Sequence, residues 1–245
     1  MPADTLFILI VVFFLTSIVG VVTGSNSLIA VPVMFHAGID PKIAVATNMF
    51  ALFFMAIGGT IPFVRQRRFE IRPLWPMIAL TVISSTFGAL LVGVISADGL
   101  KMIVSGAMIA VALFILLRPH TKRASSRAVG LTYLLVFVLG IYGGLFSGGY
   151  VTMLTAVCVG IYGMEYGEAV GATKLINVAS SGVAAIAFMW QGLVDYKLGL
   201  ILGLTMFAGA YVGAHYATKL DEVWLRRIFL TAVFILAGWT IYGLF

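Results

Sequence analysis

The feature that most constrains this chain is a series of apolar runs, most of them about twenty residues long, separated by short polar links. Of its 245 residues, 62% are hydrophobic and 10% are charged, whereas a soluble domain is about half apolar and a quarter charged. A run of this length crosses a bilayer as a helix, and the strands of a membrane barrel would alternate apolar and polar residues instead. The sequence therefore predicts an all-α integral membrane protein.

The runs predict about eight transmembrane helices. They lie at 6–22, 42–63, 73–96, 101–117, 131–145, 167–190, 198–217 and 223–245. Two further apolar segments, 28–38 and 150–161, are about a dozen residues long, which is too short to cross alone, and we expect broken or re-entrant helices there. No basic residue precedes the first run and no small-residue cleavage site follows it, so we expect a retained helix rather than a signal peptide.

The two halves of the chain resemble each other. Gly20–Gly24 aligns with Gly140–Gly144, and the stretch ending at Asn48 aligns with the stretch ending at Lys174. Each half has a break rich in Gly and Ser near its start. A repeat of about 120 residues is typical of secondary transporters, whose sites lie near the membrane midplane at such breaks. We therefore expect a first repeat at 1–117, a basic linker at 118–127 and a second repeat at 128–245.

Basic residues indicate the orientation. The loops 64–72 and 118–127 carry eight of the fifteen Lys and Arg residues, which predicts that both face the cytoplasm. If the short segments do not cross, there are eight spans, both termini join these loops inside, and the links at 40–42 and 165–168 lie outside. If they do cross, there are ten spans and the halves are inverted. The sequence leaves both arrangements open.

Lys174 is the most informative residue because it lies about two helical turns inside an apolar run. An ammonium at the centre of a bilayer costs roughly 2.5–3.5 kcal/mol on insertion scales. Lys174, Asn177 and Ser181 share one helix face, and Thr173, Asn177 and Ser180 share the next. We expect Lys174 to face a small anion. Two structural alternatives stay open, namely snorkelling to the interface and pairing with a carboxylate.

The breaks and the Lys174 face together predict the site. Helices that begin after a break point their amides at the cavity and attract anions. The candidate substrate-binding residues are Lys174, Asn48, Thr47, Thr173, Asn177, Ser25, Asn26, Ser27, Ser147, Gly148 and Gly149. The candidates for proton coupling are Glu165, Glu168, His36 and Asp40, although acids at helix starts are also ordinary caps.

Several functions are excluded by what the sequence lacks. One cysteine, Cys158, leaves no internal disulfide, and the three histidines show no metal-ligand spacing. No phosphate-binding loop, zincin motif or serine-hydrolase motif is present, and no βαβ context supports a dinucleotide site. Because the basic residues serve topology, we expect no nucleic-acid partner. We expect no enzyme activity and no cofactor; the partners are a small anion and the bilayer, and nothing marks or excludes a homodimer.

The motifs resemble the TauE/SafE family of sulfite exporter-like permeases. The resemblance rests on the first break followed by Val31-Pro32, on Ala46-Thr47-Asn48, and on the segment from Ala172 to Ser180, and it covers nearly the whole chain. It implies export of sulfite or organosulfonates across the inner membrane without ATP. Two departures bear on the substrate: Ser25-Asn26-Ser27 stands where the family is richer in glycine, and Leu154 stands in the second half where the first has Pro32.

Overall fold

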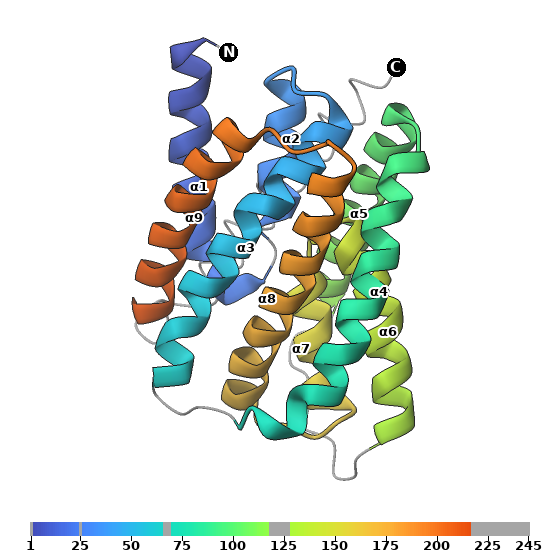
Figure 1. The fold of residues 1–245 in the computed structure, drawn as a ribbon. Coiled ribbons are helices and arrows are strands. Elements are labelled where there is room, and N and C mark those ends of the chain that lie inside the picture. Colours follow the sequence, from blue (N-terminus) through green and yellow to red (C-terminus); the bar gives the residue numbers. More distant parts are fainter. Residues whose placement is uncertain (1, 25, 66–69, 118–127, 217–245) are drawn as a thin grey trace.

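The computed structural model describes residues 2–24, 26–65, 70–117 and 128–216, and within them all regular structure is helical (Figure 1). The helices are α1 (Ala3–Thr23), α2 (Ser27–His36), α3 (Pro41–Arg65), α4 (Trp75–Val94), α5 (Ala97–Leu117), α6 (Val129–Leu145), α7 (Tyr150–Gly160), α8 (Tyr166–Trp190) and α9 (Tyr196–Tyr216), with a 3-10 turn η1 (Arg72–Leu74) before α4. The linker 118–127, the predicted helix at 223–245 and Ser25 lie outside the described residues.

The chain is a multi-pass membrane protein. Six of the described helices, α1, α3, α4, α5, α8 and α9, are long and apolar enough to span a bilayer, and α6 has 17 residues. The two segments predicted to be too short to cross form α2, with 10 residues, and α7, with 11 residues. At 1.5 Å per residue, each covers roughly half of a 30 Å hydrocarbon core.

One group of described helices runs in a common direction, namely α1, α3 and α9. Close approaches between glycines and their neighbours give the pairing: Gly199 lies against Phe50 and Gly203 against Phe54, while Gly209 lies against Phe14 and Gly213 against Ile18. Because the residue numbers rise together in both pairs of helices, α9 is parallel to α3 and also to α1.

A second group, α4, α6 and α8, is likewise parallel. Gly140 of α6 lies against Ser84 of α4, and Gly144 lies against Ser85. The Ser85 hydroxyl is 3.0 Å from the Gly140 carbonyl and 2.7 Å from the Ser180 hydroxyl of α8. Further along, Gln191, which follows α8, donates a hydrogen bond of 3.1 Å to the Ala89 carbonyl of α4.

The two groups, which we call the α1–α3–α9 unit and the α4–α6–α8 unit, run in opposite directions. Lys42 at the start of α3 donates a 2.9 Å hydrogen bond to the Gly93 carbonyl at the end of α4, so the beginning of one unit lies beside the end of the other (Figure 1). Each unit includes one helix from the other half of the chain. Helix α9 of the second half joins α1 and α3 of the first, and α4 of the first half joins α6 and α8 of the second. Helices expected to correspond, such as α3 and α8, are therefore antiparallel, as in the inverted arrangement that the sequence left open.

These directions bear on two placements that the eight-span arrangement implied. Since α1 and α3 are parallel, the start of α1 lies at the opposite end of the bundle from Arg65, so the start of α1 and the end of α3 do not share a side (Figure 1). Asp40 and Glu165 precede the antiparallel helices α3 and α8, so they too lie at opposite ends. Helix α2 brings the chain back to the end at which α1 starts, so α3 begins at that same end. The sequence does not reveal whether a short helix returns in this way.

Each short helix, α2 or α7, brings the chain back to the end of the bundle at which the preceding helix, α1 or α6, begins. Ala128, just before α6, donates a 3.2 Å hydrogen bond to the carbonyl of Ile161, just after α7. The first half does the same, because α2 must return the chain so that α3 can run parallel to α1. Each break is therefore the inner turn of a helical hairpin, with one hairpin entering the bundle from each end.

Candidate functional site

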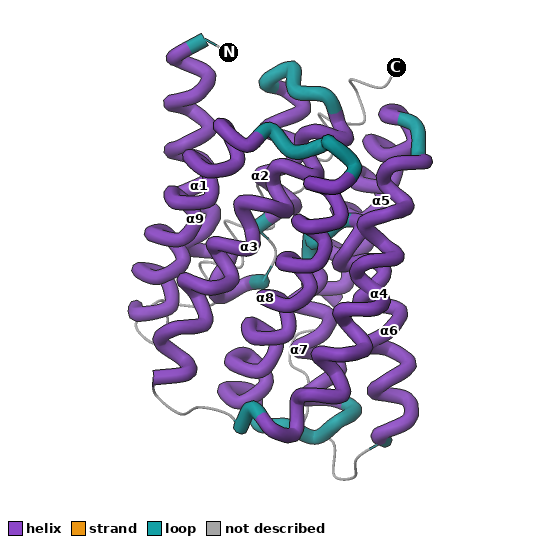
Figure 2. The backbone as a smooth tube through the Cα atoms, viewed as in Figure 1, coloured by secondary structure: helices purple, strands orange, loops and turns teal. Residues whose placement is uncertain are grey.

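The two breaks turn the chain through glycines in the left-handed region. Gly24 ends α1 with φ 75° and donates a 2.7 Å hydrogen bond to the Gly20 carbonyl. Gly149 precedes α7 with φ 79°. Glycine adopts this conformation without a steric penalty, so α1 can end at Gly24 and α7 can begin directly after Gly149 inside the bundle. Figure 2 shows short loop segments in the middle of the bundle, apart from the links at its two ends.

The breaks pack against each other's short helices. A Cβ atom on Gly24 would lie 2.9 Å from the backbone nitrogen of Thr152 in α7, and one on Gly148 would lie 2.6 Å from a methyl carbon of Leu28 in α2. The small residues at the breaks therefore allow the N-terminal ends of α2 and α7 to meet in the interior. Free backbone N–H groups at a helix start carry partial positive charge.

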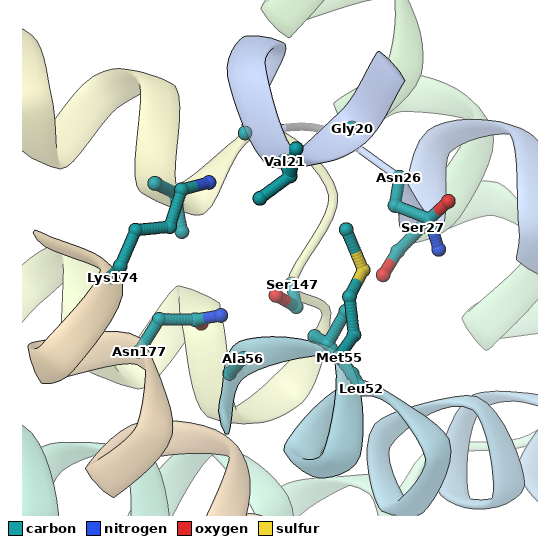
Figure 3. A pocket seen from close by; sticks show the side chains of 12 residues that line it. Gly20, Val21, Asn26, Ser27, Leu52, Met55, Ala56, Ser147, Lys174 and Asn177 are labelled. Atoms are coloured by element: carbon teal, nitrogen blue, oxygen red, sulfur yellow. The ribbon is translucent and has the colours of Figure 1, made fainter. Parts of the chain in front are cut away.

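A cavity lies where these helix starts face α3 and α8 (Figure 3). Its volume is about 20 Å³, which accommodates about one water molecule. Its polar lining consists of Asn26, Ser27, Ser147, Lys174 and Asn177, and its apolar lining of Val21, Leu52, Met55, Ala56 and Val151, with Gly20 and Gly24 completing the wall. Five of the sequence-predicted site residues are thus brought together.

Lys174 and Asn177 project from α8 on one side of the cavity (Figure 3). Only 4% of the Lys174 surface is exposed. Within the part of the chain that the structure describes, the ammonium has neither a salt bridge nor a hydrogen bond, and the described salt bridge is the surface pair Lys101–Asp98. Lys174 therefore neither pairs with a described carboxylate nor reaches the bundle surface.

Several amide atoms at this site are buried without a partner. Neither the Nδ2 nor the Oδ1 atom of Asn26 has a hydrogen bond in the described structure, and the same holds for Oδ1 of Asn177 and of Asn48. More than 90% of buried polar groups in proteins are satisfied, so the orphaned atoms of Asn26 and Asn177 in the cavity wall indicate a ligand or water that would complete them.

Asn48 lies behind the cavity rather than in its wall. Its Nδ2 donates a 2.9 Å hydrogen bond to the Ser27 hydroxyl, which does line the cavity. Gly148 and Gly149 shape the second break without lining the cavity, and Ser25 lies outside the described residues.

The two threonines of the predicted site face other helices. The Thr47 hydroxyl accepts a 3.0 Å hydrogen bond from the backbone N–H of Asp195, at the start of α9. The Thr173 hydroxyl is 3.0 Å from that of Thr155 in α7. Both side chains are buried and hold helices together, so the structure does not bring them to the cavity.

The proton-coupling candidates all lie at helix ends. The Asp40 carboxylate accepts hydrogen bonds from the backbone N–H groups of Lys42 and Ile43 at the start of α3. Glu165 precedes α8 and is exposed, Glu168 lies in the first turn of α8, and His36 ends α2 and is exposed. None of these four described residues lines the cavity.

Sequence reasoning did not identify the apolar wall. Leu52, Met55 and Ala56 follow Asn48 on one face of α3, at the spacing of neighbouring helical turns. That spacing could have extended the predicted site from Asn48, but apolar residues on a membrane helix are equally suited to face lipid. Val21 and Val151 carry no signal that separates them from packing residues.

The arrangement is suited to hold a small anion. One ammonium, unpaired amides, two hydroxyls and two helix starts surround the cavity, and no carboxylate is among its described lining residues. Charge-assisted hydrogen bonds from such donors are the strong ones in anion recognition. No group of three His, Cys, Asp or Glu residues able to hold a metal is found in the described chain.

Comparisons with known proteins point to one family. The family model described as "Sulfite exporter TauE/SafE" matches residues 9–240. A "Probable membrane transporter protein ORF9" from Sinorhizobium sp. is 30% identical over 213 residues, covering 85% of this chain and 82% of the relative. A "Probable membrane transporter protein" from Haemophilus influenzae is 25% identical and covers 98% of this chain and 95% of the relative. "Probable membrane transporter protein YfcA" from Escherichia coli K12 is 26% identical, with coverages of 95% and 89%. No solved structure matches the chain.

Proposed function

The chain belongs to the sulfite exporter TauE/SafE family and is a membrane transporter, not an enzyme; from this premise we propose that it carries small sulfur-containing anions, such as sulfite or organosulfonates. The observation that carries the proposal is Lys174, a buried ammonium with no described partner, facing a cavity between the two broken hairpins. Export is the proposed direction, following the family description. Import of another small anion is the alternative, since gradients and coupling set direction.

Each lining group has a role in this proposal. Lys174 balances the anion charge, while Asn26, Asn177, Ser27 and Ser147 donate hydrogen bonds to its oxygens. Asn48 orients Ser27, and the threonines Thr47 and Thr173 position α9 and α7 around the site. The apolar wall of Leu52, Met55 and Ala56 supports a substrate with a short carbon part, as in a sulfonate, beside its charged group.

The two antiparallel units support transport by alternating access. The α1–α3–α9 and α4–α6–α8 units enclose the cavity from opposite sides, and rocking one against the other would open each end in turn. We propose that the two halves, 1–117 and 128–245, are inverted repeats. The loops 64–72 and 118–127 then face the cytoplasm of a bacterial-type inner membrane by the positive-inside rule, which leaves the N-terminus outside.

The test is thermal stability of the purified protein with sulfite, sulfate, thiosulfate, sulfoacetate, taurine and acetate. A ligand that binds only the folded state at one hundred times its Kd adds about 2.7 kcal/mol of stability. We expect a sulfur oxyanion or sulfonate to raise the melting temperature of the wild type and not that of Lys174→Ala. Lys101→Ala, which removes a surface ammonium, is the matched control and should respond like the wild type.

Two results would redirect the proposal. If no anion stabilises the wild type and Lys174→Ala is only less stable, Lys174 holds helices together and a scaffold or sensor role is favoured. If binding is present, flux in oriented vesicles separates export from import.

A further inference from the structure

The described lining of the cavity contains the Lys174 amino group but no group that could balance its charge when it is protonated. Lys174 is the one charged side chain among the described lining residues, and neither a salt bridge nor a hydrogen bond engages its nitrogen in the described structure. An unpaired charge in a low-dielectric interior is strongly unfavourable, whereas a paired one is tolerated. The free energy of the ammonium therefore depends on whether an anion is bound.

Other titratable groups lie elsewhere. Helix α8 packs on α3, α4, α6 and α7, and α1 and α2 reach the cavity as well. The charged and titratable side chains of these described helices are Asp4 in α1, His36 in α2, Lys42 and Arg65 in α3, Tyr133 and Tyr142 in α6, Tyr150 and Cys158 in α7, and Tyr166 and Glu168 in α8, while α4 has none. None of them lines the cavity, so within the described chain only Lys174 can exchange a proton with a bound substrate there.

We propose that Lys174 is itself the proton carrier of this transporter. The neutral amine takes up one proton as one anion enters, forming an ammonium–anion pair with no net charge, and it loses that proton when the anion leaves. The inference rests on the proposed function and assigns its coupling ion. Glu165, Glu168, His36 and Asp40, which the sequence offered for this role, lie at helix ends and are not needed for it.

The scheme has definite consequences for flux. Anion and proton move in the same direction, so a pH difference drives the anion toward the alkaline side. For a singly charged anion the loaded and empty forms cross without net charge, so membrane potential has no effect on flux. Export by this route runs on an outward gradient of the anion itself, because an acidic exterior opposes it.

The experiment uses methanesulfonate, whose charge stays at minus one across the working pH range, so that any pH effect belongs to the protein. Binding to the purified full-length protein is measured against pH, together with proton uptake in weak buffer. We expect about tenfold weaker affinity per pH unit where the empty site is neutral, and up to one proton taken up per anion. In Lys174→Arg the guanidinium keeps its proton, so the affinity of this variant should not depend on pH.

Proteoliposomes test the coupling in transport. An alkaline lumen should drive accumulation of radiolabelled methanesulfonate by the wild type and by Glu165→Gln and Glu168→Gln. Lys174→Arg should keep exchange of labelled for unlabelled anion but lose accumulation.

Wild-type binding without proton uptake would overturn the coupling, and so would accumulation that is driven by membrane potential or lost in Glu168→Gln. Absence of both binding and exchange in the wild type, with sulfite as well as methanesulfonate, would instead overturn the proposed function. The measurements of binding, proton uptake and accumulation on the wild type test the proposal even if Lys174→Arg does not fold.

Discussion

At the scale of single residues, the two halves contribute unequally to the cavity. Asn48 and Lys174 occupy matching positions in the sequence alignment, yet Asn48 donates its hydrogen bond to Ser27 while Lys174 faces the cavity unpartnered. The helix faces that follow these two residues, in α3 after Asn48 and in α8 after Lys174, also differ. In α3 the wall continues through Leu52, Met55 and Ala56, whereas in α8 it continues through Asn177. At this wall α8 therefore supplies charge and polarity, and α3 supplies an apolar surface.

Asn48→Ala tests whether Asn48 acts through Ser27. A hydrogen bond contributes about 0.5–1.5 kcal/mol net, so loss of this one should weaken anion binding by about two- to tenfold, because Ser27 is no longer held toward the cavity. Titration of methanesulfonate by thermal shift measures the change. Thr60→Ala is the control, since Thr60 is a buried hydroxyl on the same helix that bonds only to its own backbone at Ala56. Equal affinity in both variants would show that Ser27 needs no support from Asn48.

The structure brings only part of the predicted polar face of α8 to the cavity, for a geometric reason. Lys174 and Asn177 line the cavity, but Thr173 bonds toward α7 and Thr47 toward α9. Adjacent residues on a helix are separated by about 100° of rotation, so a polar neighbour of a site residue faces a different helix. Which neighbouring helix lies there is a tertiary fact that the pattern of one segment does not contain.

At the scale of elements, small residues set the distance between α4 and α6. A Cβ on Gly88 would lie 1.9 Å from the Ile141 carbonyl oxygen, and one on Gly144 would lie 2.0 Å from the Ser85 carbonyl oxygen. The two backbones thus touch, as in small-residue packing of membrane helices.

Gly88→Ala should therefore force α4 and α6 apart. Overpacking of this kind lowers the free energy of unfolding by about 1–3 kcal/mol. Because the obstructing atoms belong to the backbone, we expect the loss for Gly88→Ala to lie at the upper end of this range. The matched control is Gly106→Ala in α5, where a Cβ meets nothing within 4 Å; alanine should be neutral or stabilising there. Thermal unfolding in detergent compares the two variants, and similar stabilities would contradict the close approach of α4 and α6.

The helices themselves were largely predictable, but their directions were not. The predicted segment 42–63 became Pro41–Arg65, and 150–161 became Tyr150–Gly160. Hydrophobicity and caps define where a helix begins and ends, and they do so locally. Direction depends on whether each short helix returns to the side of its predecessor, and the basic loops 64–72 and 118–127 share a side under either arrangement.

At the scale of the whole molecule, the antiparallel units predict an unusual sidedness for the N-terminus. With Cys158 replaced by Ala, single cysteines at Ala3 and Ser96 should react with an impermeant maleimide on intact cells. Cysteines at Glu70 and Glu165 should react only after permeabilisation, because these residues lie at the opposite end of the bundle. Labelling of Ala3→Cys together with Glu70→Cys from one side would contradict the parallel course of α1 and α3.

Alternating access requires the α1–α3–α9 and α4–α6–α8 units to separate at one end while they meet at the other. In this conformation they are joined at the N-terminal end of α3, where Lys42 reaches Gly93 of α4. A cross-linker about as long as a lysine side chain, placed between Lys42→Cys and Gly93→Cys in a cysteine-free background, should abolish exchange of labelled methanesulfonate across proteoliposomes but preserve its thermal shift. Gly93→Cys with Gln191→Cys is the matched control, because that pair lies within one unit and should transport when cross-linked. Undiminished transport by the cross-linked Lys42–Gly93 pair would mean that this end never opens, and the moving elements would then have to be the broken hairpins α1–α2 and α6–α7.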